Sequence, residues 1–199
     1  MTDTTRERII MAGAELIHAR GFNNTGIKEI VETAGVPKGS FYFYFSSKEA
    51  FGLAVVDQYE ATFLERLHAL ATETSLSPLD RLRAFFERTQ QRFASQGYSR
   101  GCPLGNLAQE MGDLSPAFQE RLERAMRHLT RILADLLQQA VDAGELDTAE
   151  LGPHPLEEIA FFIVEAWHGA LVRMKSAKSG EPLDICRRMI FERVLRRPL

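Results

Sequence analysis

The side chains best suited to chemistry gather in residues 25–49, TGIKEIVETAGVPKGSFYFYFSSKE. Lys38 can donate hydrogen bonds to guanine edges or to phosphate, and Gly39 lets another backbone approach closely. Tyrosine hydroxyls and the ammonium group of Lys48 are typical partners of phosphate oxygens. These residue types in this order predict contact with a groove of DNA.

Two short helices joined by a glycine turn must position these side chains. The first helix is predicted by apolar residues at helical spacing, which are Ile27, Ile30, Val31 and Ala34. Thr25 can cap the start of this helix, and Gly35 suits the left-handed conformation that follows its end. Pro37 suits the first turn of a second helix, over about residues 38–45.

The second helix has more aromatic residues than its core can take. Phe41 and Phe45 lie four residues apart and can both face the core. The residues left for outside contacts are Lys38, Gly39, Ser40, Tyr42, Phe43 and Tyr44. The alternative is a helical hairpin in which all five aromatic residues are core, but the segment is too short to bury them. A third helix follows from Lys48, with Ser46 or Ser47 as its cap.

Residues 6–51 resemble the N-terminal helix-turn-helix domain of the TetR/AcrR family of transcriptional repressors. The matching residues are Ile9, Ala14, Leu16, Gly21-Phe22, Thr25, Ile30, Ala34-Gly35-Val36, Lys38-Gly39-Ser40-Phe41-Tyr42, Tyr44-Phe45 and Lys48-Glu49. The resemblance implies an all-α homodimer that binds double-stranded DNA at a palindromic operator and releases it when a ligand binds. Gly26 and Pro37 depart from the usual family residues, so the operator sequence stays open.

The resemblance also implies roles for individual residues. Contacts to bases map onto Lys38, Gly39, Ser40, Tyr42 and Phe43. Contacts to phosphates map onto Thr25, Tyr42, Tyr44 and Lys48. Lys28 is added as a further cation, since Arg6, Lys28, Lys38 and Lys48 must share one face if they are to meet DNA.

The rest of the chain is helical by pattern, so we expect an all-α protein. A helix-turn-helix DNA-binding domain is expected over residues 1–47, and a helical effector-binding and dimerisation domain over residues 48–199. Further helices are expected over residues 48–73, 77–97, 104–111, 115–144 and 156–178, and a last helix is expected from residue 183, after the separator Gly180-Glu181-Pro182, to about residue 196. The sequence has no repeat, low-complexity tract or convincing strand.

The last two of these helices predict a dimer surface. Apolar and small residues cover more than one face of the first helix, and they are Ile159, Phe162, Ile163, Ala166, Gly169, Ala170 and Val172. A stripe on the last helix consists of Ile185, Met189, Ile190 and Val194. A helix that is apolar on more than one face needs more than one partner. Packing within one subunit is the alternative, and it must account for part of this surface.

Cys102 is the candidate effector residue. It lies in a Gly/Pro turn at a helix start, where helix amides lower the pKa of a thiol. Residues 100–110 and 167–175 resemble the NemR- and AcuR-like branch of the family. The resemblance implies that Cys102 senses electrophiles or oxidants and that Lys175 can join it covalently, which requires the two side chains to lie within about 4–6 Å.

The expected effector pocket is lined from the helices that hold Phe63, Asn106, Trp167 and Lys175. Two alternatives for Cys102 stay open. A small molecule can bind the pocket without covalent chemistry, or the thiol can be a buried structural residue, since free cysteine is often buried. For Cys186, in the expected dimer helix, we favour a structural role.

Composition excludes several other classes of protein. The chain has 199 residues and a net charge of -3, which argues against a protein that coats DNA without sequence preference. No segment has the length of a membrane span, and the charged N-terminus has no apolar signal core. Two distant cysteines make no disulfide framework. These features favour a cytoplasmic protein.

Catalysis finds little support in the sequence. The five histidines show no ligand spacing with cysteines or paired carboxylates, so no metal is expected. No phosphate-binding glycine loop or nucleophile elbow is present, and no cofactor is expected. A helical enzyme or scaffold remains as a remote alternative to a ligand-gated DNA-binding repressor.

Overall fold

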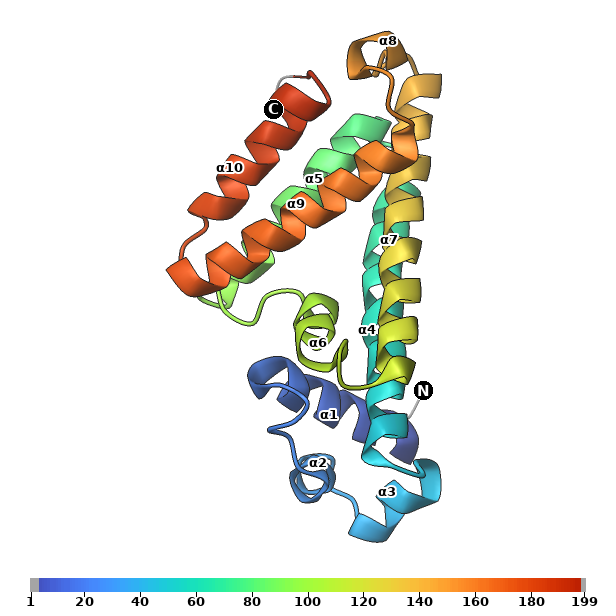
Figure 1. Cartoon of the computed structure of the whole chain (residues 1–199), viewed down its shortest axis with the longest axis vertical. Helices are drawn as coiled ribbons and strands as arrows, with labels where there is room; N and C mark the ends of the chain where they lie inside the picture. The colour runs from blue at the N-terminus through green and yellow to red at the C-terminus, as the bar shows by residue number, and fades with distance from the viewer. Residues whose placement is uncertain (1–3, 198–199) are drawn as a thin grey trace. The chain divides into compact units, whose positions relative to one another are not determined.

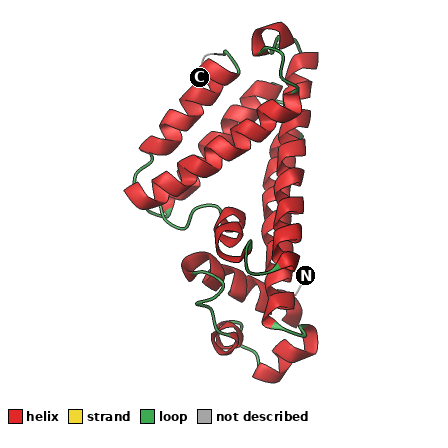
Figure 2. Ribbon diagram, in the orientation of Figure 1, coloured by secondary structure: helices red, strands yellow, loops and turns green. Residues whose placement is uncertain are grey.

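A computed structural model describes residues 4–197 of the chain (Figure 1). Within this range the regular elements are all helical (Figure 2). The helices are α1 Thr5–Arg20, α2 Ile27–Thr33, α3 Lys38–Tyr44, α4 Lys48–Ala71, α5 Pro78–Ser95, α6 Pro103–Met111, α7 Pro116–Asp142, α8 Thr148–Leu151, α9 Leu156–Ala177 and α10 Glu181–Met189, followed by the π-helical segment η1 Ile190–Val194. The predicted all-α fold is confirmed.

The chain divides into two compact units. The first unit joins Met1–Phe63 to Pro103–Ala125, and the second joins Leu64–Cys102 to Met126–Leu199. This division differs from the expected boundary after residue 47. The helices α4 and α7 have 24 and 27 residues, and each is long enough to take part in both units. A functional boundary at residue 48 stays a prediction.

The core of the first unit holds the helix-turn-helix together. Its fully or almost fully buried side chains include Ile9, Ile10, Ile17, Phe22, Ile30, Val31, Phe41, Phe51 and Phe118. Thr4 caps α1 and makes a reciprocal capping box with Glu7, which satisfies amides that the first helical turn leaves unpaired. The ring of Phe22 packs edge-on against Phe118 with ring centroids 5.1 Å apart. The start of α7 therefore packs in the same core as the turn that follows α1.

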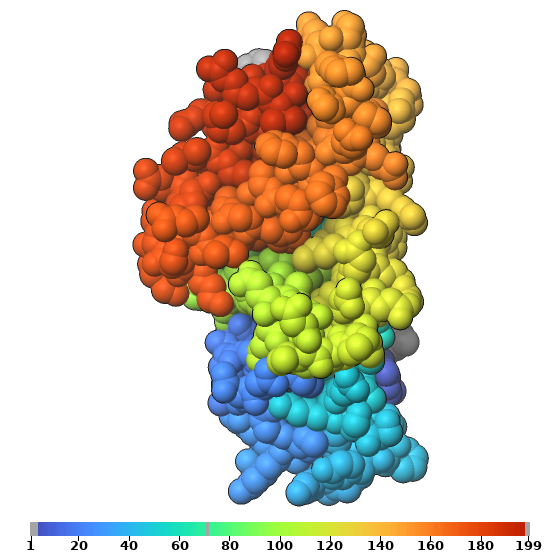
Figure 3. All heavy atoms as spheres, viewed as in Figure 1, coloured from blue at the N-terminus to red at the C-terminus, as the bar shows by residue number. Residues whose placement is uncertain are grey.

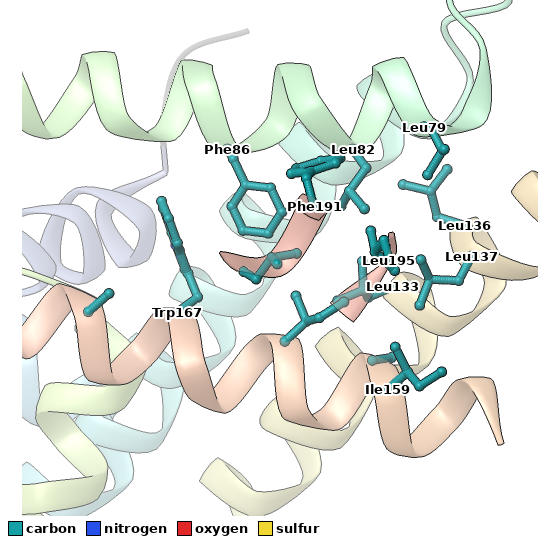
Figure 4. Close-up of a cluster of buried hydrophobic side chains, with 14 of the residues drawn as sticks. Leu79, Leu82, Phe86, Leu133, Leu136, Leu137, Ile159, Trp167, Phe191 and Leu195 are labelled. Atoms are coloured by element: carbon teal, nitrogen blue, oxygen red, sulfur yellow. The ribbon is translucent and has the colours of Figure 1, made fainter. Parts of the chain in front are cut away.

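The core of the second unit is formed by α5, α7, α9, α10 and η1 (Figure 4). The Phe86 ring contacts the rings of Trp167 and Phe191, with centroids 4.7 Å and 6.1 Å away. Both contacts are edge-to-face, the arrangement that aromatic quadrupoles favour. Because Trp167 is 7% exposed, its indole is mainly a core side chain.

Helix ends agree with the sequence to within a few residues, with two exceptions. The short helix α8 was not predicted, because four residues are too few for a periodic pattern; Asp147 caps it by accepting from the Ala149 amide. The last predicted helix changes to π-helical geometry at Ile190. Ser47 caps α4 through the Ala50 amide. The Glu49 carboxylate accepts from the Ser115 hydroxyl.

The described residues form neither a membrane span nor a metal site. None of the helices between residues 4 and 197 combines the length and apolarity that crossing a bilayer requires. Over the same part of the chain, no group of three or more His, Cys, Asp or Glu side chains is placed to hold a metal ion.

Candidate DNA interface and thiol site

The turn between α2 and α3 sets the direction of the candidate recognition helix. Gly35 adopts φ +65°, the left-handed conformation predicted for it. The Val36 amide then donates to the Val31 carbonyl over 3.0 Å, which closes the end of α2. Pro37 is the N-cap residue of α3 and not, as predicted, part of its first turn. Helix α3 consequently begins at Lys38.

Helix α3 divides into an inner and an outer face as predicted. Phe41 and Phe45 are buried, and their rings contact Phe51 with centroids 5.3 Å and 5.1 Å away. The outward aromatic side chains are Tyr42, Phe43 and Tyr44, which are 56%, 81% and 38% exposed. Lys38 and Gly39 are also exposed, and Ser40 is half-buried. Large aromatic side chains in water are unfavourable unless a partner covers them.

Gly39 offers a sharp prediction about this face. A Cβ atom added at Gly39 would meet no heavy atom within 4 Å, and the residue lies in ordinary helical backbone. Gly39→Ala should therefore raise the free energy of unfolding slightly, by up to about 1 kcal/mol, since alanine favours helix. If DNA approaches this backbone, the same change should lower operator affinity. Thermal unfolding and fluorescence anisotropy measure the two effects; unchanged affinity would contradict the close approach.

Thr25 does not cap α2 as predicted. Its side chain is 0% exposed, and its hydroxyl donates to the Gly21 carbonyl over 2.7 Å. The N-cap of α2 is Gly26, with no side-chain cap, so the predicted threonine cap was wrong. The hydroxyl is engaged in the turn before α2. A phosphate contact by Thr25 stays a prediction.

The two other cations assigned to DNA have different surroundings. Lys48 is half-buried, with its Nζ 4.5 Å from the centroid of the Phe22 ring and 3.5 Å from the Asn23 carbonyl oxygen. Burial lowers the pKa of Lys48, and the negative charge of Glu110 partly opposes this shift. Lys28 is exposed and lies 3.8 Å from Glu32. A phosphate contact from either lysine stays a prediction.

The segment before Cys102 has unusual backbone geometry. Tyr98 and Arg100 adopt φ +53° and φ +68°, a region that costs side-chain-bearing residues of order 1 kcal/mol or more. Two glycines, Gly97 and Gly101, adopt similar angles without that cost. These turns lead from the end of α5 to Cys102, which is half-buried and packs against the core of the second unit.

On α9, His168 hydrogen-bonds Cys102. Burial disfavours the charged imidazolium, but the hydrogen bond to Cys102 and the charges of Cys102 and Glu165 outweigh burial, so the pKa of His168 is raised. The predicted partner, Lys175, is exposed and lies two turns further along α9. The thiol is thus paired with an imidazole in the structure.

The sequence could not single out His168. Trp167 and His168 are neighbours in mid-helix, so sequence position alone does not tell which of them meets Cys102. Phe63 and Asn106 belong to the first compact unit, whereas Cys102 and Trp167 belong to the second. A pocket shared by these four residues stays a prediction.

The two cysteines should differ strongly in reactivity. Burial raises the pKa of Cys186 from 9.0 to about 11. Since the thiolate is the nucleophile, this shift alone should slow alkylation of Cys186 at pH 7 by about a hundredfold. Mass spectrometry after a short pulse of iodoacetamide should find Cys102 labelled and Cys186 unlabelled, with Cys186 reacting as the pH approaches 11. Equal labelling at pH 7 would refute the difference.

The candidate dimer surface is partly interior and partly exposed. Ile159, Ile163, Ala170 and Ile190 are buried within the second unit. The large apolar side chains that remain exposed on α9 and α10 are Phe161, Phe162, Val172, Ile185 and Met189. These five residues form what we call the apolar stripe. The prediction that internal packing explains part of the surface is confirmed.

Comparison with known proteins places this geometry among transcriptional regulators. Residues 9–55 match the model of bacterial regulatory proteins of the tetR family, and residues 78–190 match that of the tetracyclin repressor-like C-terminal domain. The chain is 40% identical to the transcriptional regulator AcuR of Cereibacter sphaeroides, covering 89% of this chain and 79% of AcuR. It is 36% identical to the HTH-type transcriptional repressor NemR of Escherichia coli K12, and the match covers 90% of this chain and 88% of NemR.

A solved structure agrees with these matches. The crystal structure of a regulatory protein TetR from Rhodobacter sphaeroides superposes with a TM-score of 0.85 and 35% identity. The superposition covers 94% of this chain and 97% of that chain. Both the helix-turn-helix and the helices that follow it therefore share the fold of that regulator.

Proposed function

Because the chain belongs to the TetR family of transcriptional regulators, we propose that it is a repressor that binds a palindromic operator as a homodimer. Family members bind operator DNA, typically as dimers, and respond to small molecules. In our proposal each protomer places α3 in one major groove. The two recognition helices then lie roughly 34–36 Å apart, one turn of DNA.

The outer face of α3 supports the DNA part of the proposal. Lys38 and Gly39 stand at the start of the helix, where recognition helices meet base edges. Tyr42 and Tyr44 carry exposed hydroxyl groups that can donate to phosphate. Phe43 is the most exposed of the large apolar residues of α3 and can contact a thymine methyl group.

The apolar stripe supports the dimer. Its members come from two adjacent helices, α9 and α10, that pack against each other. Phe162 and Val172 lie on α9, and Gly169 between them is exposed, which allows close approach of a second helix. A twofold dimer would cover this stripe with its own copy, as a symmetric operator requires.

We assign the regulatory input to Cys102, and the observation that carries this assignment is its hydrogen bond with His168. The imidazole can accept the thiol proton, which leaves a thiolate beside an imidazolium. The thiolate sulfur then forms a covalent bond with an electrophilic carbon. On an alkyl halide the halide leaves with the bonding electron pair; on an activated alkene the C=C π bond breaks, and the adjacent carbon takes up the proton from the imidazolium. The modified side chain favours the state that does not bind the operator, because release requires a difference in free energy between the two states.

The proposal is tested on DNA from the promoter of the protein's own gene. Anisotropy titrations should show sequence-specific binding whose affinity falls steeply as salt rises, because phosphate contacts release counterions. Sedimentation of the complex should give two or four chains per operator. Binding without sequence preference, or a single chain on a full operator, would refute a dimeric repressor.

Control of operator release by Cys102 is tested with the same protein–DNA complex. Release of the operator in step with alkylation of Cys102 would support covalent sensing. Release by a compound that leaves Cys102 unmodified would identify the pocket as a non-covalent site, with the cysteine structural.

A further inference from the structure

A carboxylate on α6 holds the turn between α1 and α2. The amides of Phe22 and Asn23 both donate to the Glu110 carboxylate, over 2.8 Å and 2.7 Å. Hydrogen bonds to an ionised carboxylate are about twice as strong as neutral ones. All three residues lie in the first compact unit. Helix α6 is therefore bonded directly to the turn that precedes α2.

The turn is shaped to admit this carboxylate. Gly21 has φ +93°, and a Cβ atom there would lie 2.9 Å from the Glu110 Oε2 atom. The neighbouring Met111 adds a second contact, since its sulfur lies 3.8 Å from the Asn23 Nδ2 atom. Figure 3 shows the atoms of α6 packed directly against those of α1 in this region. Glycine at position 21 thus satisfies both the backbone conformation and the close approach.

The same turn is bonded to the DNA-binding helices. The buried Thr25 hydroxyl donates to the Gly21 carbonyl, and the Thr25 amide donates to the Phe22 carbonyl over 3.2 Å. Helix α2 begins two residues after Thr25. On the other side, the Lys48 ammonium lies over the Phe22 ring and near the Asn23 carbonyl. A shift of the turn therefore displaces the start of α2 and the first residue of α4 together.

Helix α6 connects this turn to the thiol site along the chain. Its first residue, Pro103, follows Cys102 directly, and Glu110 is its eighth residue. A helix of nine residues is a rod of about 13 Å. One end of α6 is thus bonded to the candidate sensor residue, and the other end carries the carboxylate that holds the turn.

We propose that Glu110 is a positioning residue for operator binding, which passes displacements of α6 to the helix-turn-helix. In the unmodified protein it holds the turn where α2 and Lys48 can engage DNA. The second part of this proposal, the transmission of a displacement of α6, rests on the proposed function, because it takes modification of Cys102 as the cause of that displacement. Modification moves the first turn of α6, and the Glu110 carboxylate carries the movement to the Phe22 and Asn23 amides.

The test uses Glu110→Gln, which keeps the size of the side chain but replaces one acceptor oxygen with a donor. One of the two amides then loses its partner. We expect operator affinity to fall roughly tenfold, as for loss of a hydrogen bond to a charged group. Cys102 should be alkylated at the parental rate, while its alkylation should change the remaining operator affinity less than twofold. Gln109→Ala, at an exposed neighbour on the same helix, is the matched control and should behave as the parent.

Parental operator affinity and parental release in Glu110→Gln would overturn the proposal. If Glu110→Gln does not fold, hydrogen–deuterium exchange of the parent decides: alkylation of Cys102 should speed exchange at the Phe22 and Asn23 amides, and unchanged exchange would overturn the regulatory role. If alkylated parent stays on the operator, the proposed sensor function fails. The effect of Glu110→Gln on affinity would then still support or refute the positioning role.

Discussion

Tyr42→Ala should weaken operator binding by at least roughly tenfold while leaving the protein folded. The side chain is more than half exposed, and surface substitutions usually change the free energy of unfolding by less than about 0.5 kcal/mol. A lost side-chain contact to DNA costs about 1–3 kcal/mol, and a dimer loses it in both half-sites. Anisotropy with labelled operator measures the affinity, and circular dichroism with thermal unfolding checks the fold.

Leu114→Ala is the matched control for this experiment. Leu114 is a large apolar residue of the same compact unit, it is 67% exposed, and it lies far from α3 in sequence. Its removal tests whether any loss of exposed apolar surface weakens binding. Parental affinity in Tyr42→Ala, or an equal loss in Leu114→Ala, would show that α3 does not read the operator through this face.

Cys102→Ser should abolish electrophile-driven release and leave operator affinity near the parental value. Serine keeps the size of the side chain, but its hydroxyl is not a nucleophile at neutral pH without strong activation. In the parent, alkylation should lower operator affinity by about 5–150-fold, the usual range of coupling between two sites. Anisotropy before and after treatment measures the change, and mass spectrometry confirms the modified residue. Parental release from Cys102→Ser would assign Cys102 to packing alone.

His168→Ala and Lys175→Ala separate the two candidate partners of the thiol. Because His168 hydrogen-bonds Cys102, its loss should slow alkylation of Cys102 by about tenfold or more. Lys175 is exposed, and its loss should leave the rate unchanged. If loss of Lys175 slowed alkylation and loss of His168 did not, Lys175 would be the partner of the thiol, as the family resemblance implies.

Local sequence patterns predicted the features that depend on near neighbours. The inward positions of Phe41 and Phe45 follow from their spacing of four residues, and the left-handed Gly35 follows from its place after the last apolar residue of α2. These features need only one helix and the turn beside it.

Features that depend on distant residues could not be read in the same way. Thr25 suits a helix cap, but it also suits a buried hydrogen bond to Gly21, and only the packed turn decides between them. His168 and Lys175 are seven residues apart and share one helical face, so periodicity cannot tell which of them meets Cys102. In the folded helix they lie about 10 Å apart along the axis, and the packing at Cys102 selects His168. The bonds from Phe22 and Asn23 to Glu110 span more than 80 residues and have no local signal.

The most direct test of the account is the helical phasing of the operator. Two α3 helices related by a twofold axis must meet half-sites on one side of the duplex, about 10–10.5 base pairs apart or a multiple of that spacing. Once the operator is mapped, about five base pairs inserted at its centre rotate one half-site by half a turn. We predict that this insertion lowers affinity to the non-specific level. Unchanged affinity for the rotated half-sites would contradict a dimer that reads DNA with two copies of α3.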